Sequence, residues 1–399
     1  MANVNLMNFN QAATLLNAIY QQATGESNLA ATNLSEFVSQ AQTTLRTGYD
    51  PVLTAISNVL GKTIFSVRPY TRKFKSLEVT EQQYGAHARK LVALDKPFEE
   101  DDRIKLVDGQ SIDQQRVNKP SVLQTNFYGQ DIYQKSLTIF RDQLDVAFTG
   151  PEEFAQFVSM ILQNASDQME QAYEVTARAT IANFIGAKTK ADAANVIHLV
   201  SVYNADTGST LTTATVRKPE NFIPFTKWLY GYLKTLSGML SERSVKYHKN
   251  LETADTTPIM IPRHTPITDQ RMYIYTPDIN RMNASVLADV YHDELLKMAE
   301  HEEVNYWQSI NSPAQINVTP SYVDDTGAIV ASPAAAAVDN ILGVIFDREA
   351  MGITRVNEWT ANAPFNARGG YTNMYWHFTL RYWNDLTENA VVLLLDTAS

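Results

Sequence analysis

The chain of 399 residues contains no cysteine. Disulfide bonds, thiolate nucleophiles and cysteine-ligated zinc or iron–sulfur centres are therefore excluded. The N-terminal residues lack both a basic region and a long apolar run, so they do not predict a signal peptide. No apolar run approaches the length needed to cross a bilayer, and we expect no membrane partner.

Motifs for catalysis are also missing. The sequence has no phosphate-binding loop, no dinucleotide-binding glycine motif, no nucleophile elbow and no kinase signature. Its seven histidines are scattered, and no two have the i, i+4 spacing of a zinc-binding helix. His292 and His301 are each followed by acidic residues, but we interpret that stretch as a polar helical surface. The sequence therefore predicts no catalytic residue, no cofactor and no metal site.

Basic residues are outnumbered, with 33 Lys and Arg against 43 Asp and Glu, which gives a net charge of -10. Wrapping nucleic acid requires a concentrated basic face, so the bulk surface is not expected to bind it. Such a surface can still lie near nucleic acid without adhering to it. Hydrophobic residues make up 44% of the chain, which is enough for a large core. At this length we expect two or more lobes.

The first 62 residues predict a helical arm with little core of its own, because short stretches of helical spacing occur at 8–22, 34–45 and 51–60. Residues 63–121 differ in being rich in charge and without a clear core period. Their first limb is basic and their returning limb is acidic. We interpret this segment as a projecting two-limbed loop, and the alternative is an ordinary solvated loop.

Residues 122–140 predict strands, and the longest helix follows at 151–186. Pro151, Glu152 and Glu153 make a strong helix start, since proline suits the first turn and acids complement the helix dipole. An apolar stripe then continues to Gly186. A helix of this length extends about 50 Å at ~1.5 Å per residue. The stripe is not a strict heptad seam, so we expect the helix to lie across a sheet rather than in a coiled coil.

Helix and strand signals alternate through residues 190–345, which predict a second lobe. The expected elements are a helix at 219–239, a strand at 271–275, helices at 279–288 and 293–299, a strand at 341–346 and a helix start at 347–349.

The last thirty residues carry the clearest strand pattern. One row of side chains is apolar and aromatic, and alternates with a polar row: Met374, Trp376, Phe378, Leu380 and Tyr382 against Asn373, Tyr375, His377, Thr379 and Arg381. Period two with aromatic enrichment is typical of a half-buried strand. The apolar run at 390–395 does not alternate, which suits a strand covered on both faces. We expect these strands to form the sheet on which the long helix lies.

This order of elements resembles the major capsid proteins of tailed bacteriophages, whose Hong Kong-type fold is shared with the herpesvirus shell floor. The likeness is carried by residues 126–174, 341–353 and 368–396, and is greatest to the capsid proteins of small podoviruses with protein-primed genomes. The resemblance implies an α+β fold in five segments: an N-terminal arm (1–62), an extended loop (63–121), a peripheral domain (122–189) with a spine helix (151–186), an axial domain (190–345) and a return to the peripheral sheet (346–399).

The resemblance also implies a function. The chain would assemble into hexamers and pentamers that form an icosahedral or prolate head around double-stranded DNA, in the cytoplasm of a bacterial host. Its implied partners are other copies of itself, a separate scaffolding protein, a portal and packaged DNA without sequence-specific contact. An encapsulin-like nanocompartment shell is the alternative within this fold. A hydrolase or carbohydrate-active enzyme is the alternative outside it, supported only by scattered carboxylates and aromatic residues.

A shell subunit needs extensive surfaces that complement other copies. Charges at the rim of such contacts fix register more than affinity. We predict that the two limbs of the loop contact an adjacent subunit through their charged residues: Arg72, Lys73, Lys75, Arg89 and Lys90 on the basic limb, and Glu99, Glu100, Asp101 and Asp102 on the acidic limb.

Overall fold

The structure is a computed structural model that describes residues 9–26, 31–48, 51–52, 55, 72–79, 88–94, 100–111, 115, 121–253, 258–285, 300–331 and 333–398. The chain forms two compact units, each built from three segments. Unit 1 contains Met1–Tyr84, Gln130–Ala177 and Ile353–Arg381. Unit 2 contains Gly85–Gly129, Arg178–Gly352 and Tyr382–Ser399.

Two N-terminal helices of unit 1 match the predicted ones: α1 (Phe9–Thr24) and α2 (Leu34–Arg46). The Asn33 side chain caps α2 by accepting the Glu36 backbone N–H at 3.0 Å. The Glu36 carboxylate in turn accepts the backbone N–H of Thr32 at 2.8 Å. Much of the helix predicted at 51–60 lies outside the described residues.

The long helix α5 (Pro151–Ala191) has 41 residues and begins at the predicted residue, but it continues five residues beyond Gly186. That glycine does not end the helix. A Cβ atom there would lie 2.8 Å from Cγ2 of Val318, so glycine permits close packing against this neighbour. Lys188 and Lys190 in the last turn complement the negative end of the helix dipole.

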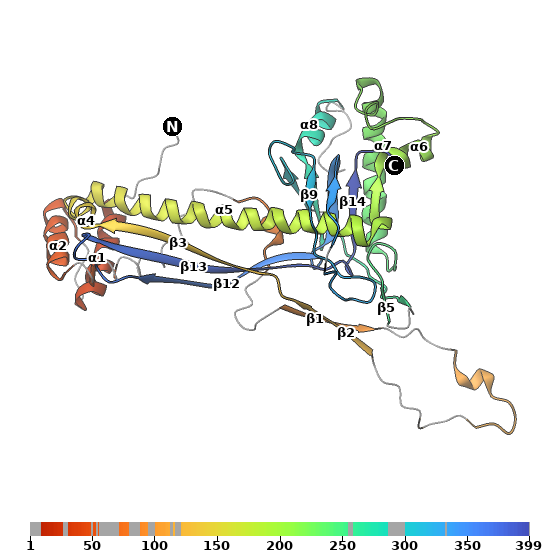
Figure 1. The fold of residues 1–399 in the computed structure, drawn as a ribbon, viewed down its shortest axis with the longest axis horizontal. Helices are drawn as coiled ribbons and strands as arrows, with labels where there is room; N and C mark the ends of the chain where they lie inside the picture. Colours follow the sequence, from red (N-terminus) through yellow and green to blue (C-terminus); the bar gives the residue numbers. More distant parts are fainter. Residues whose placement is uncertain are drawn as a thin grey trace. The chain divides into compact units, whose positions relative to one another are not determined.

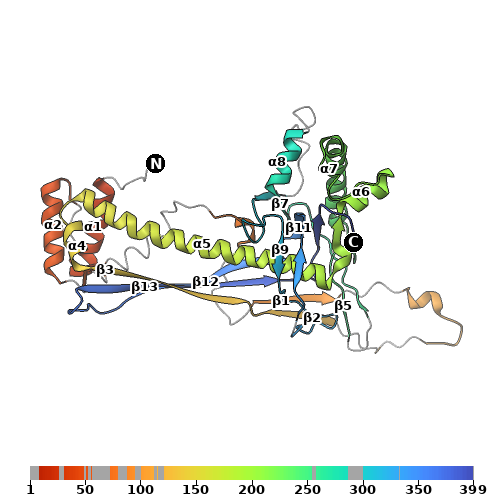
Figure 2. The ribbon, with the colours of Figure 1, turned by 45° about the horizontal axis from the view of Figure 1, so that its top comes forward.

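A three-stranded sheet packs on α5 within unit 1. Its order is β12 (Met351–Asn362), β13 (Tyr371–Asn384) and β3 (Gln130–Phe140). Figures 1 and 2 both show these strands running along one side of α5. The Tyr133 hydroxyl of β3 lies 2.8 Å from the Thr176 hydroxyl of α5, and its ring stacks on Phe378 of β13. The Phe378 row of the sheet therefore faces the helix.

Strand β13 confirms the predicted alternation. Its apolar row is buried and its polar row is only half-buried: Met374, Trp376, Phe378 and Leu380 against Asn373, Tyr375, His377 and Thr379. The pattern ends at Arg381, which is buried, and Tyr382, which is half-buried. These are the residues at which the strand passes from unit 1 into unit 2.

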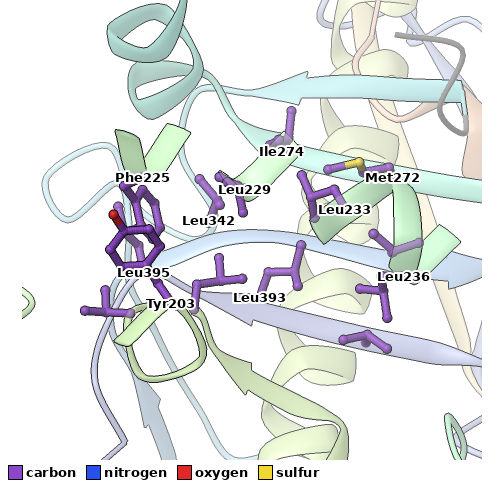
Figure 3. Packing of buried hydrophobic residues seen from close by; sticks show 14 of the residues in the cluster. Tyr203, Phe225, Leu229, Leu233, Leu236, Met272, Ile274, Leu342, Leu393 and Leu395 are labelled. Carbon is purple, nitrogen blue, oxygen red and sulfur yellow. The ribbon is translucent and has the colours of Figure 1, made fainter. Parts of the chain in front are cut away.

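Unit 2 is built on a five-stranded mixed sheet, in the order β4 (Val196–His198), β14 (Ala390–Leu394), β11 (Ile341–Asp347), β7 (Gln270–Tyr275) and β8 (Glu300–Val304). Every residue of β11 and β14 is buried, which confirms the prediction of a strand covered on both faces. Besides the end of α5, this unit contains the helices α6 (Leu199–Thr207), α7 (Pro219–Ser241) and α8 (Thr276–Ser285). Figure 3 shows leucines of α7 meeting side chains of β7, β11 and β14.

Shorter elements complete the described chain. Strands β1 (Ala88–Leu94) and β2 (Ser121–Phe127) pair antiparallel, with Ala88 opposite Phe127 and Leu94 opposite Ser121. The others are α4 (Arg141–Ala147), η2 (Lys75–Leu77), η3 (Asp102–Lys105), η4 (Ala193–Asn195), the pair β5 (Leu251–Glu252) with β6 (Pro258–Ile259), and the pair β9 (Ile316–Val318) with β10 (Ala336–Val338).

Three expectations differ from the structure. The predicted single return segment 346–399 is divided, because 353–381 belong to unit 1 while β14 pairs with β11 and β4 in unit 2. The helix start predicted at 347–349 is wrong. There Asp347 ends β11, and its carboxylate accepts the Glu349 backbone N–H at 2.8 Å, which forms a turn. The helical interpretation around His301 is also wrong, since that residue lies in β8; His292 and the helix predicted at 293–299 fall outside the described residues.

The packing of β13 generates a test of its two faces. Replacing the buried Trp376 with Ala should lower the free energy of unfolding by about 3–5 kcal/mol, because it leaves a large cavity in the core. Replacing its half-buried neighbour Tyr375 with Ala should cost no more than about 1 kcal/mol. Urea denaturation of the dissociated chain measures both values. Equal losses for the two variants would contradict the assignment of the faces.

Candidate site for contacts between subunits

Arg72, predicted to contact a neighbouring subunit, is buried within unit 1. Its Nη1 donates to both carboxylate oxygens of Glu170 on α5, at 2.8 and 3.1 Å. Its Nη2 donates to Glu78, and its guanidinium lies 4.0 Å from the centre of the Tyr173 ring. Glu170 is itself buried, so this is a desolvated ion pair with a stacked aromatic partner. The charge of Arg72 is thus neutralised inside its own chain.

The residues after Arg72 are held against unit 1 as well. Phe74 and Leu77 are buried, and the Val79 backbone N–H donates to the Ile353 carbonyl at 3.0 Å. Phe74 has a φ of 64°, a left-handed conformation that is strained for a bulky residue. Burial of its side chain supplies the interaction that maintains this conformation. The basic limb therefore begins as an anchored segment.

Lys90, on β1, occupies a second cluster of charges, in unit 2. Its Nζ lies 3.2 Å from Oδ2 of Asp385 and 3.1 Å from Oε2 of Glu349, and it donates to Glu388. Asp385 and Glu388 are buried, and Glu388 also pairs with Nη2 of Arg263 at 3.0 Å. Burial alone would lower the pKa of Lys90, but the nearby carboxylates outweigh it and hold this pKa above its ordinary value. The lysine consequently stays charged, and ties β1 to the turn after β13.

The remaining candidates lie at the surface or outside the described residues. Lys73, Lys75 and Arg89 are exposed, and so are Glu100 and Asp101. The Asp101 carboxylate accepts the Arg103 backbone N–H at 3.0 Å and its Nε at 2.7 Å, which fixes the start of η3. Asp102 is the first residue of η3, but the placement of its side chain is not described, and Glu99 lies outside the described residues.

Candidate residues that are adjacent in the sequence therefore have different surroundings in the structure. Arg72 is buried beside exposed Lys73, and on β1 the side chains of Arg89 and Lys90 point to opposite faces, as successive residues of a strand do. The residues around Arg72 and Lys90 do not indicate their buried partners Glu170, Asp385 and Glu388, nor the exposed partner Glu349. The one available signal was the turn around Asp385, whose carboxylate accepts the Thr387 backbone N–H at 2.9 Å.

In the residues searched, no cluster of three or more His, Asp or Glu side chains has the geometry to hold a metal ion. None of the described helices combines the length and apolarity that spanning a membrane requires. His377, on the polar row of β13, stacks on Trp359 with ring centres 3.9 Å apart. The ion pairs of Arg72 and Lys90 each join separate segments of the chain.

Replacing Arg72 with Met should lower the free energy of unfolding by about 3–5 kcal/mol, because it leaves the buried Glu170 carboxylate without its cation. The matched control, Lys73→Met, removes an exposed charge one residue away and should change stability by no more than about 0.5 kcal/mol. Chemical denaturation of both variants gives the comparison. A negligible effect of Arg72→Met would show that the ion pair does not anchor the loop.

The Lys90 cluster predicts a loss of stability at alkaline pH. A lysine whose folded-state pKa is raised stabilises the fold fully below its ordinary pKa of 10.5, and this contribution disappears as pH rises through the higher folded value. Lys90→Met cannot titrate and removes the cation beside the buried Asp385, leaving Glu388 with Arg263 alone, at a cost of about 3–5 kcal/mol near neutral pH. The difference in unfolding free energy between the two proteins should stay constant from about pH 8 to about pH 10, then shrink. A difference that is independent of pH up to strong alkali would contradict this role.

Comparisons with known proteins address the fold and the family. The capsid structure of Staphylococcus phage Andhra is similar, with a TM-score of 0.52 and 10% identity over 84% of this chain and 86% of that chain. A structure of the head fiber and inner core protein gp22 of native bacteriophage P68 also contains a similar chain, with a TM-score of 0.52 and 9% identity over 82% of this chain and 85% of that one. At such identity the likeness concerns the fold alone. A search of curated proteins finds no match.

A family model described as the Phi29-like phage major capsid protein matches residues 13–394, which is nearly the whole chain. The resemblance to tailed-phage capsid proteins is therefore confirmed, and the proteins of this family are structural components of the virion shell. The chain belongs to the Phi29-like phage major capsid proteins and is a self-assembling shell protein of a tailed bacteriophage.

Proposed function

We propose that the chain assembles as hexamers and pentamers that close into a phage head around double-stranded DNA, in the cytoplasm of a bacterial host. The observation that carries this proposal is the family match over residues 13–394 of a 399-residue chain. We further propose that the protein has a structural role without catalysis. In support, the buried charges around Arg72 and Lys90 have partners within the chain and hold structural segments in place.

A scaffolding protein, a portal and the packaged genome are the proposed partners besides other copies. The excess of acidic residues, with a net charge of -10, supports a shell that contains DNA without binding it tightly. The organisation expected from the sequence, apart from its single return segment, belongs to the same proposal. In it, the α5 helix and its sheet form the peripheral domain, and residues 190–345 form the axial domain.

The charged loop is proposed to contact an adjacent copy through the cations that are exposed: Lys73, Lys75 and Arg89. Their proposed partners are acids of the neighbouring copy, among which Glu99, Glu100, Asp101 and Asp102 remain candidates. Arg72 and Lys90 play a different part, since their charges are engaged inside the chain. Arg72 holds the start of the limb on unit 1, beside Lys73 and Lys75, and Lys90 holds β1 within unit 2, beside Arg89.

Electron microscopy of the purified chain, with and without a co-expressed scaffolding protein, tests the assembly. We expect closed shells, or sheets and tubes made of rings of six. Subunits that remain monomeric under all conditions would overturn the proposal.

Reversing the exposed charges tests the loop contact. The triple variant Lys73→Glu, Lys75→Glu, Arg89→Glu should slow assembly and alter its salt dependence, because rim charges act mainly on association. The control replaces the same three residues with Gln, which removes the charge without reversing it and should have a smaller effect. Light scattering during assembly over a range of salt concentrations follows both. Identical yield and salt sensitivity in the reversed and unaltered proteins would refute the contact.

A further inference from the structure

A turn that follows η3 contains the only place in the sequence where aspartate precedes glycine, Asp108-Gly109. The Gln110 backbone N–H donates to the Val107 carbonyl at 3.0 Å and closes the turn. Gly109 has a φ of 86°, which suits glycine at the third position of such a turn. All four residues of the turn are exposed. Water therefore has access to both members of the Asp-Gly pair.

The groups of this pair that could react with each other are not engaged elsewhere. In the described part of the chain, the Gly109 N–H has no acceptor, and the Asp108 carboxylate has neither a donor nor a cation beside it. A Cβ atom placed on Gly109 would meet nothing within 4 Å. The nearby Asp101 differs, because its carboxylate accepts the Arg103 N–H at 3.0 Å. Asp108 and Gly109 are thus free to approach each other.

An aspartate in this setting can rearrange without an enzyme. The Gly109 nitrogen attacks Cγ of Asp108, so that an N–Cγ bond forms and a carboxyl oxygen leaves as water. Glycine favours this step because no Cβ shields its nitrogen, and the two groups are held in one short segment. A second water opens the resulting succinimide ring. Breaking the original peptide bond leaves the chain running through Cγ, as isoaspartate with a free α-carboxylate, whereas breaking the new bond restores aspartate.

Two exposed asparagines that precede small residues are held against the same reaction. Asparagine forms the same ring with loss of ammonia, and again needs the next backbone nitrogen. Asn311 precedes Ser312, whose N–H donates to the Ser309 carbonyl at 3.2 Å. The Asn366 side-chain oxygen accepts two backbone N–H groups, at 3.1 and 2.9 Å, which fixes the side chain in a turn. The fold thus restrains these two sites and leaves Asp108 unrestrained.

We propose that Asp108 is a modification site, at which the folded chain forms isoaspartate and so becomes a substrate for a carboxyl methyltransferase that uses S-adenosylmethionine. The enzyme transfers a methyl group to the free α-carboxylate and releases S-adenosylhomocysteine. Isoaspartate adds one carbon to the backbone of the turn, which changes the spacing that the bond from Gln110 to Val107 requires. The reaction needs no second copy of the chain, so it is independent of the proposed assembly.

Incubation of the purified chain near neutral pH, followed by peptide mapping, tests the proposal. Trypsin releases residues 106–116 as one peptide, whose aspartate and isoaspartate forms have equal mass and separate by chromatography. We expect the isoaspartate form to accumulate and to accept labelled methyl groups from S-adenosylmethionine through an isoaspartyl methyltransferase. Asp108→Glu should lower this labelling at least about tenfold, because it must close a six-membered ring. Equal labelling of the variant, or none in the unaltered peptide, would overturn the proposal.

Unfolding the chain in guanidinium chloride tests whether the fold selects this site. Conversion at Asn311 and Asn366 should rise at least about threefold, because unfolding removes the hydrogen bonds that restrain them. Conversion at Asp108 should change by less than about twofold, since the folded turn already leaves it free. Peptide mapping of folded and unfolded samples incubated for the same time gives all three values. A rise at Asp108 as large as that at Asn311 would show that the folded turn protects it, and would refute the proposal.

Discussion

The packing of one sheet face against the long helix α5 is the constraint on which the rest of unit 1 depends. The buried row of β13 meets Tyr133 of β3, and Tyr133 reaches Thr176 of α5. Residues 178–352 separate Phe378 of β13 from both Tyr133 and Thr176. Because β13 has period two, fixing one row against the helix directs the other row outward. The same packing therefore creates the core and the outward-facing row of the sheet together.

The paired cations illustrate a second constraint. Arg72 and Lys90 are neighbours of exposed charges, yet each has a buried carboxylate as a partner: Glu170 for Arg72, and Asp385 and Glu388 for Lys90. A buried ion pair contributes little over a well-packed apolar pair, but losing one partner is strongly destabilising. Such a pair therefore favours one position of the segment that carries the cation over other positions. At the start of the loop, this specificity adds to the hydrophobic packing of Phe74 and Leu77.

The sequence predicts those features that depend on local pattern. Sequence pattern alone predicts the start of α5 at Pro151, the two faces of β13 and the complete burial of β14, since each follows from a residue suited to the first helical turn or from the period of apolar residues. The end of α5 could not be predicted in this way, because Gly186 permits close packing against Val318, a residue distant in the chain. His301 lies in a strand for a similar reason, as β8 is stabilised by pairing with β7.

The ion pairs of Arg72 and Lys90 could not be predicted for the same reason, because their partners lie far away in the sequence. Nothing in the residues around Arg72 or Lys90 distinguishes them from Lys73 or Arg89, because burial is decided by the carboxylates that meet them from α5 and from the segment after β13. Nor does the resemblance to a family supply that detail. The sequence identifies the loop, but only the structure shows which of its cations form ion pairs within the chain and which are exposed.

The division of each unit among three chain segments has a consequence for biosynthesis. Unit 1 acquires β13 only when residues up to 381 are available, and the sheet of unit 2 acquires β14 only when residues 390–394 are available. Neither core can therefore close before these strands have left the ribosome. A nascent subunit cannot present a finished surface to its neighbours before β14 has been synthesised. The order of segments thereby delays polymerisation until both sheets can be completed.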